Sequence, residues 1–146
     1  MIVIGIDPDS KAHGVAFYYD GELVNIDRLK RRELIIEVEE WLSVDYTVLS
    51  IENVLANSST WRAKAGEKAA VSAKKGMAIG KLHQATQELI DDLDGLHIPY
   101  KLHKVSSKWK DQQGKKEFER ITGWNKRSNE DTRSAAYFGF LEAYRG

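Results

Sequence analysis

The sequence predicts an α/β fold with a mixed five-stranded sheet, in which three antiparallel strands precede parallel strands and helices flank the sheet. Three observations predict it. The first thirty residues contain three β-rich runs separated by short turns. Two further β-rich runs follow later. Segments with helical periodicity separate these later runs, as the long crossovers between parallel strands require.

The three N-terminal strands are expected at Ile2–Asp7, His13–Tyr19 and Glu22–Leu29. Pro8 ends the first strand because proline lacks the N–H that a central strand donates. The Asp20-Gly21 dipeptide between the second and third strands is a strong signal for a two-residue hairpin. These three strands therefore form an antiparallel meander.

The remaining elements are expected in this order: a helix over 33–42, a strand over 47–54, one or two helices over 61–93, a strand over 100–105, a helical or partly mobile basic segment over 108–121, and a helix over 129–144. Residues 47–54 are apolar and β-branched and too few for a helix. The choice between one helix and two over 61–93 stays open, because Gly66, Gly76 and Gly80 interrupt an otherwise helical pattern.

Composition predicts one domain over residues 1–146, without disulfides or cysteine ligands, because the chain has no cysteine. No apolar run reaches the length of a membrane span, so a cytoplasmic protein is expected. The net charge is zero, but residues 59–81 carry six basic groups against one acidic and residues 101–127 carry nine against three. The two positive segments indicate either a mixed-charge surface or a binding site for an anionic polymer.

Four carboxylates lie where separate elements can bring them together: Asp7, Glu52, Glu130 and Asp131. Asp7 ends the first strand and Glu52 lies in a later apolar strand, where a charge is costly unless it is paired or bound to metal. Clustered carboxylates are the ligands that Mg²⁺ prefers, and two-ion nucleases need several of them. Each also has a structural explanation: Asp7 as a turn residue, Glu52 as an ion-pair partner, and the other two as acids favoured by a helix dipole.

Three motifs resemble, in the same order, those of the RuvC-type Holliday junction resolvases, which are ribonuclease H-like nucleases. They are Gly-Ile-Asp-Pro-Asp-Ser at 5–10 followed by Gly14, Ile-Glu-Asn-Val at 51–54, and Asp-Thr-Arg-Ser-Ala-Ala at 131–136. The first motif alone also occurs in sugar-kinase-like ATPases, whose second lobe a chain of this length lacks. The resemblance implies a ribonuclease H-like fold with Asp7, Glu52 and Asp131 as metal-binding carboxylates.

Two positions depart from the family pattern. Asp9 stands where the family usually has glycine, and Ser134 stands where it has a fourth acid. Glu130 is the candidate for a partial substitute. The missing acid leaves open a non-catalytic protein that binds branched DNA, and the shared fold leaves open a nuclease acting on RNA–DNA hybrids.

The resemblance also implies a DNA-binding surface on the two positive segments. The candidate residues are Trp61, Arg62, Lys64 and Lys68 in the first segment, and Lys108, Lys115 and Lys116 in the second. Lysine and arginine contacts to phosphate position DNA without reading its sequence. Leu55 stands where the family often has an aromatic side chain that stacks at the junction. Trp61 could take that stacking role instead, or it could pack on the helix below it.

The predicted function is therefore a Mg²⁺-dependent endonuclease of DNA recombination and repair, with Mn²⁺ as an alternative ion and no small-molecule cofactor. It would resolve Holliday junctions, and related forks and flaps, by phosphodiester hydrolysis that leaves 5′-phosphate ends. The resemblance further implies a homodimer that nicks two strands symmetrically. The short chain resembles phage-encoded members of the family, which act in the host cytoplasm.

Overall fold

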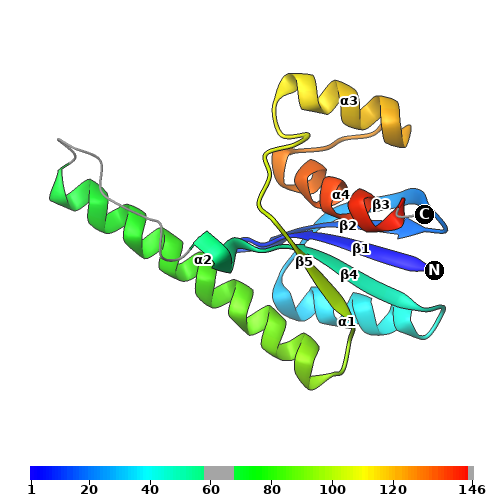
Figure 1. The fold of residues 1–146 in the computed structure, drawn as a ribbon, viewed down its shortest axis with the longest axis horizontal. Helices are drawn as coiled ribbons and strands as arrows, with labels where there is room; N and C mark the ends of the chain where they lie inside the picture. Colours follow the sequence, from blue (N-terminus) through cyan, green and yellow to red (C-terminus); the bar gives the residue numbers. More distant parts are fainter. Residues whose placement is uncertain (58–67, 145–146) are drawn as a thin grey trace.

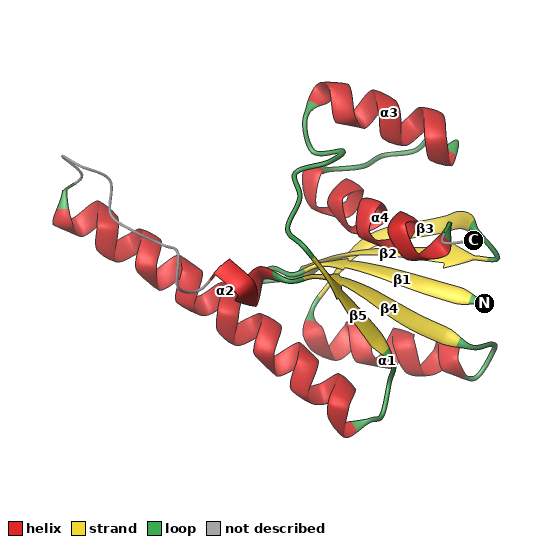
Figure 2. Cartoon of the chain, in the orientation of Figure 1, coloured by secondary structure: helices red, strands yellow, loops and turns green. Residues whose placement is uncertain are grey.

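A five-stranded mixed sheet forms the centre of the protein, whose computed structural model describes residues 1–57 and 68–144. The strands are β1 (Ile2–Asp7), β2 (His13–Tyr19), β3 (Glu22–Leu29), β4 (Thr47–Glu52) and β5 (Tyr100–His103). They lie in the order β3-β2-β1-β4-β5. β1, β2 and β3 pair antiparallel, whereas β4 and β5 join the sheet in parallel. The predicted mixed sheet is confirmed (Figure 2).

Helices cover both faces of this sheet (Figure 1). They are α1 (Arg31–Leu42), α2 (Ala69–Gly95), α3 (Gln112–Thr122) and α4 (Glu130–Ala143), and a short 3-10 turn, η1 (Val54–Asn57), follows β4. Alternate residues of β1 point to opposite faces, as strand geometry dictates. Ile4 packs in one apolar cluster with α1 and α2, and Val3 packs in the other with α4 and Phe118 of α3.

Several element boundaries differ from the sequence expectations, including the start of α1 and the end of β5. β4 ends at Glu52, two residues early, because η1 begins at Val54. The helix after it is a single one over the described residues, and Gly76 and Gly80 lie inside it without a break. α3 begins only at Gln112, because the Asp111 carboxylate accepts a hydrogen bond from the Gly114 N–H at 2.6 Å and caps the helix.

The N-terminal half of α2 extends well beyond the sheet (Figure 1). Its buried residues, Thr86, Leu89, Ile90 and Leu93, all lie in the C-terminal half. Val71 and Met77, in the other half, are 42% and 63% exposed. Although α2 has 27 residues, no helix in the described ranges combines the length and apolar character that a membrane span requires.

α4 lies unusually close to the centre of the sheet. A Cβ atom added to Gly5 of β1 would lie 2.0 Å from the Ala135 carbonyl oxygen and 2.5 Å from the Gly139 nitrogen. Two side chains of the sheet also donate hydrogen bonds to α4 carbonyls: the Tyr18 hydroxyl to Ala136 and the Ser50 hydroxyl to Phe138, each at 2.6 Å. This close contact fixes the position of the start of α4 relative to the end of β1.

Candidate active site

Asp7 and Glu52 lie at the ends of two adjacent strands. β1 and β4 are parallel, and their register pairs Ile6 with Ile51, the residues directly before the two acids. Both side chains are therefore carried to the same edge of the sheet, where they are 5% and 7% exposed. The carboxyl ends of parallel strands are the usual place for binding sites in α/β sheets.

Asp131 reaches this edge from the first turn of α4. Asn129 caps the helix: its side-chain oxygen accepts from the Thr132 N–H at 2.9 Å, and its own N–H donates to the Thr132 hydroxyl at 3.0 Å. Gly14, the β2 residue paired with Asp7, leaves room for the helix start, because a Cβ there would lie 2.4 Å from the Asp131 carbonyl oxygen. Three of the four predicted acids therefore converge from β1, β4 and α4.

The converging carboxylates carry negative charge that the protein compensates incompletely. Burial, followed by the charge of Asp7, raises the pKa of Glu52 to about 7. Burial also raises the pKa of Asp7, and the charge of Asp131 adds to this effect. Three groups oppose these shifts. The Ser134 hydroxyl and Lys110, whose Nζ lies 3.6 Å from Asp7 Oδ2, lower the pKa of Asp7, and the Ser106 N–H, which donates to Glu52 Oε2 at 3.4 Å, lowers that of Glu52.

The chemistry of these residues fits a hard divalent cation. Asp7 Oδ2 is buried, and within the described residues it accepts no hydrogen bond. Buried carboxylate oxygens with raised pKa values bind cations favourably, because the cation supplies the charge that water would otherwise solvate. No group of three or more histidine or acidic side chains in the described ranges is already arranged to hold a metal ion. Side-chain rotation is therefore needed to complete a coordination shell.

Glu130, Ser134 and Asp9 differ in their relation to this cluster. Glu130 is exposed on the surface of α4, whereas Ser134 is fully buried beside Asp7, where its hydroxyl lowers the pKa of that carboxyl. Asp9 accepts a hydrogen bond from Arg28 Nη2 at 3.2 Å, and its N–H donates to His13 Nδ1 at 3.1 Å. Glu130 as a substitute for the missing acid therefore stays a prediction, and Asp9 holds the turn after β1.

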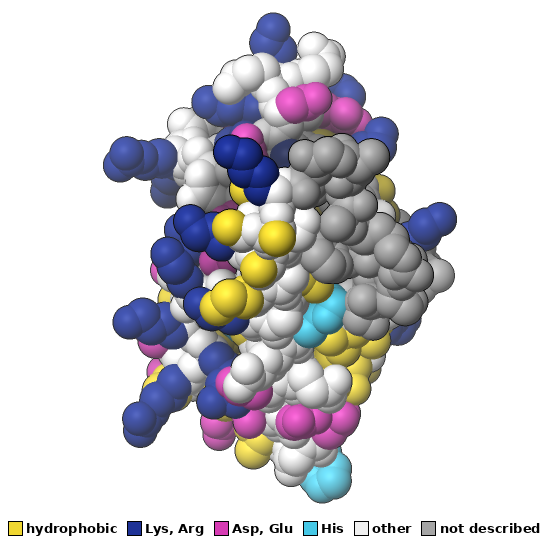
Figure 3. All heavy atoms as spheres, turned by 90° about the vertical axis from the view of Figure 1, so that its left-hand side faces the viewer, with side chains coloured by type: hydrophobic (Ala, Val, Ile, Leu, Met, Phe, Trp, Pro, Cys, Tyr) yellow, Lys and Arg dark blue, Asp and Glu magenta, His cyan; other side chains and the backbone are white. Residues whose placement is uncertain are grey.

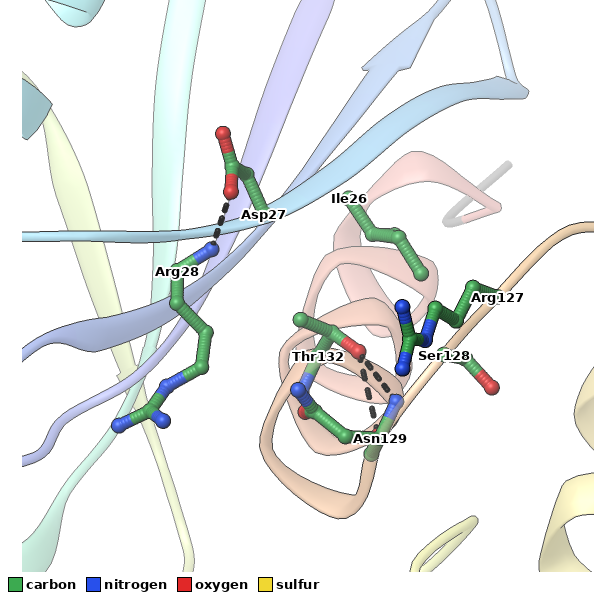
Figure 4. Close-up of a pocket in the computed structure, with 7 residues that line it drawn as sticks. All are labelled: Ile26, Asp27, Arg28, Arg127, Ser128, Asn129 and Thr132. Carbon is green, nitrogen blue, oxygen red and sulfur yellow. Dashed lines mark hydrogen bonds between the residues drawn. The ribbon is translucent and has the colours of Figure 1, made fainter.

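A pocket of about 580 Å³ borders the cluster through Arg28. Figure 4 shows its residues, which come from β3, from the segment that leads into α4 and from the first turn of α4: Ile26, Asp27, Arg28, Arg127, Ser128, Asn129 and Thr132. Arg28 Nε also lies 3.9 Å from Asp131 Oδ2. One residue that lines the pocket, Arg28, therefore lies next to a carboxylate of the cluster.

Lys110 is the residue near the cluster that the sequence analysis did not select. Lys108 is exposed and Lys115 and Lys116 lie on α3, whereas Lys110 extends from the β5–α3 segment to Asp7. Lys68 is exposed directly before α2. Trp61, Arg62 and Lys64 lie outside the described residues. No sequence signal separates Lys110 from its basic neighbours, because its orientation depends on the tertiary structure.

The raised pKa of Glu52 predicts that this carboxylate destabilises the metal-free protein at neutral pH. Its pKa rises from 4.5 to about 7 on folding, so the folded state binds more protons between these values. Protonation of Glu52 therefore stabilises the folded state. This stabilisation is fully present below pH 4.5 and is lost as the pH rises through 7. We expect the free energy of unfolding of Glu52→Gln to be higher than that of the wild type by on the order of 2–3 kcal/mol at pH 8, and almost equal to it at pH 4.5. Urea unfolding in EDTA measures this difference.

His13 acts in the opposite direction. Burial lowers its pKa from 6.5 to about 4, so its contribution to stability is lost as the pH falls through that range. The measurement therefore compares Glu52→Gln with the wild type at each pH, so that the effect of His13 cancels. Glu39→Gln, an exposed substitution on α1, is the matched control. If the advantage of Glu52→Gln does not grow with pH, the carboxylate is not buried with uncompensated charge.

Comparisons with known proteins show what this arrangement resembles. No protein-family model and no curated protein sequence matches the chain. Among solved structures, Thermus thermophilus RuvC in complex with a Holliday junction substrate matches with a TM-score of 0.53 and 14% identity, over 98% of this chain and 92% of that one. A further Thermus thermophilus RuvC structure matches with a TM-score of 0.47 and 14% identity, over 98% and 93%. The chain therefore has a RuvC-like, ribonuclease H-like fold.

Proposed function

We propose that the protein is a metal-dependent endonuclease that cuts four-way junctions and related branched DNA. The observation that carries this proposal is the convergence of Asp7, Glu52 and Asp131 at one edge of the sheet, where burial raises the pKa values of Asp7 and Glu52. The fold supports it, since the matched RuvC structure holds a Holliday junction substrate. Crossover junction endodeoxyribonuclease is the corresponding activity.

Asp7, Glu52 and Asp131 would hold Mg²⁺, or Mn²⁺ in its place. When bound, such ions activate a water molecule and neutralise the phosphate. The residues of the chain then have distinct tasks. Burial of Asp7 and Glu52 excludes competing water, and the Ser106 N–H fixes the orientation of Glu52. The Lys110 ammonium, beside Asp7, contacts the non-bridging oxygens of the scissile phosphate. Hydrolysis breaks the bond to the 3′ oxygen and leaves a 5′-phosphate.

The basic segments supply a surface for the DNA backbone. Lys68, Lys74, Lys75 and Lys81 lie on or next to the projecting half of α2, and all are exposed. Figure 3 shows the side of the molecule from which α2 projects. Lysine and arginine side chains lie along one edge of this view, next to a row of hydrophobic side chains. Contacts of this kind supply affinity that does not depend on sequence. Lys108, Lys115 and Lys116 extend the proposed surface. Trp61, Arg62 and Lys64, the other predicted DNA-binding residues, lie outside the described residues.

A homodimer is part of the proposal. The projecting half of α2 exposes Val71 and Met77, which a second copy of the chain would cover. Two copies would place two carboxylate clusters on one junction and so account for paired nicks. Sedimentation of the protein with and without junction DNA measures the oligomeric state, and a monomer under both conditions would count against paired nicking.

The deciding experiment incubates the purified protein with an end-labelled four-way junction, a linear duplex or an RNA–DNA hybrid, in Mg²⁺ or in EDTA. We expect metal-dependent nicks in opposing strands of the junction and little cutting of the duplex. Preferential cutting of the hybrid would assign the protein to RNA–DNA substrates instead. Tight junction binding without any cut would mean that a serine at position 134 has left a non-catalytic binding protein.

A further inference from the structure

Arg133 of α4 is a buried cation that binds backbone carbonyls. It is 5% exposed. Its Nε donates to the Trp109 carbonyl at 2.8 Å, its Nη2 donates to the Lys110 carbonyl at 2.6 Å, and its Nη1 donates to the Ser128 hydroxyl at 3.2 Å. Among the described residues, no carboxylate lies within ion-pair distance of it. Burying a guanidinium in this way is costly, so these hydrogen bonds need an explanation beyond packing.

The two carbonyls belong to the segment that joins β5 to α3, which turns sharply at Trp109. Trp109 has φ +68°, a conformation that side-chain-bearing residues rarely adopt. Such strain costs about 1–3 kcal/mol and persists only where the surroundings enforce it. Here the indole ring packs against Phe118, Tyr137 and Phe140, with ring centroids 5.3–5.6 Å away. Aromatic packing therefore fixes the side chain of Trp109, and Arg133 fixes its carbonyl.

Lys110 is the residue that this arrangement orients. It directly follows Trp109, and its Nζ lies 3.6 Å from Asp7 Oδ2. Its own carbonyl is held by the shorter of the two Arg133 hydrogen bonds to the backbone. Arg133 also lies on the same helix as Asp131, two residues further along. One buried side chain thus connects the helix that carries a site carboxylate to the segment that carries the site lysine.

We propose that Arg133 is a positioning residue, which holds Lys110 in the nuclease site by binding the Trp109 and Lys110 carbonyls. The inference rests on the proposed function. A lysine on a mobile segment would sample many orientations, and a displacement of about 1 Å at a reacting group lowers rates on the order of 100-fold. Arg133 touches no substrate in this assignment and acts only through Lys110.

A double-mutant cycle tests this assignment. Arg133→Met, Lys110→Ala and the double variant are compared with wild type in kcat and KM for junction cleavage in Mg²⁺. We expect each single variant to lower kcat by roughly 30- to 100-fold with little change in KM. The double variant should be no slower than Lys110→Ala alone. Losses that multiply in the double variant would overturn the assignment, because Arg133 would then act independently of Lys110.

Two further variants separate positioning from general stability. Arg133→Lys keeps the charge and reaches one carbonyl, so we expect it to recover part of the lost kcat. If it behaves like Arg133→Met although it is folded, carbonyl binding is not the cause and the assignment fails. Arg32→Met, on the exposed surface of α1, removes one guanidinium without touching the β5–α3 segment and should keep the wild-type kcat.

Hydrogen exchange gives a readout that does not depend on cleavage. In the metal-free protein, Arg133→Met should speed amide exchange across residues 104–111 at least tenfold, while β1 and β4 stay protected and Lys110→Ala leaves the segment unchanged. Arg133→Lys, compared in the same way, replaces Arg133→Met if the latter does not fold. Unchanged exchange in the folded variant would overturn the proposal. If the wild type cuts no DNA but Arg133→Met shows the expected faster exchange, the nuclease function is overturned instead.

Discussion

Replacing Asp7 with asparagine is expected to reduce metal-dependent junction cleavage by on the order of 10³-fold or more. Asparagine keeps the shape of the side chain but removes its charge and replaces one oxygen with an NH₂ group that repels a cation. Asp7 is the most buried of the three clustered acids and has a carboxylate oxygen without a hydrogen bond among the described residues. Single-turnover cleavage in Mg²⁺ measures the loss.

Two controls show that the loss is chemical. Junction binding in Ca²⁺ or EDTA should stay within about threefold of wild type, because the lysines supply most contacts to the phosphates. The free energy of unfolding should not fall, because burial raises the pKa of Asp7 and the variant removes that unfavourable charge. Asp91→Asn, an exposed change on α2, should cleave normally. Wild-type cleavage by Asp7→Asn would remove Asp7 from the site.

Replacing Gly5 with alanine is expected to destabilise the fold by on the order of 4 kcal/mol or more. Overpacking usually costs about 1–3 kcal/mol when side chains can adjust. Here the added methyl would meet backbone atoms, the Ala135 oxygen at 2.0 Å and the Gly139 nitrogen at 2.5 Å. α4 would have to move away from β1, and Asp131 would move with it. Urea unfolding measures the cost, and cleavage should fall in parallel.

Gly80→Ala is the matched control for this prediction. Gly80 lies inside α2, and a Cβ there would have no heavy atom of the described residues within 4 Å, apart from the backbone of its own helix and its chain neighbours. Alanine is favoured over glycine in helices by about 1 kcal/mol, so this variant should be more stable than wild type. The same chemical change is therefore expected to act in opposite directions at the two positions. A Gly5→Ala protein as stable as wild type would contradict the close packing of α4 on the sheet.

Local signals explain why the sheet could be predicted. The three N-terminal strands have the predicted bounds. The Asp20-Gly21 turn has positive φ at both residues, as a two-residue hairpin of this type requires. The unbroken α2 was less predictable, because glycine inside a helix lowers stability without forcing a break. The early end of β4 at Glu52 depends on the following η1 turn rather than on strand propensity.

The residues of the candidate site could be proposed from the sequence, but their geometry could not. Motifs indicated Asp7, Glu52 and Asp131, whereas their convergence depends on the room left by Gly5 and Gly14 beneath α4. Lys110 could not be distinguished from its basic neighbours by sequence. Its orientation follows from the positive φ of Trp109 and from the hydrogen bonds of a distant arginine, and both are tertiary effects.

The joining of β1 to α4 at the carboxylate cluster has a consequence for biosynthesis. Asp7 and Glu52 emerge from the ribosome before Asp131, which follows with α4. Contacts between segments so far apart in sequence form late in folding, because closing a long loop costs entropy first. A nascent chain without α4 would therefore hold only part of the proposed metal site. The proposed activity toward DNA would begin only after α4 has been synthesised and has packed on the sheet.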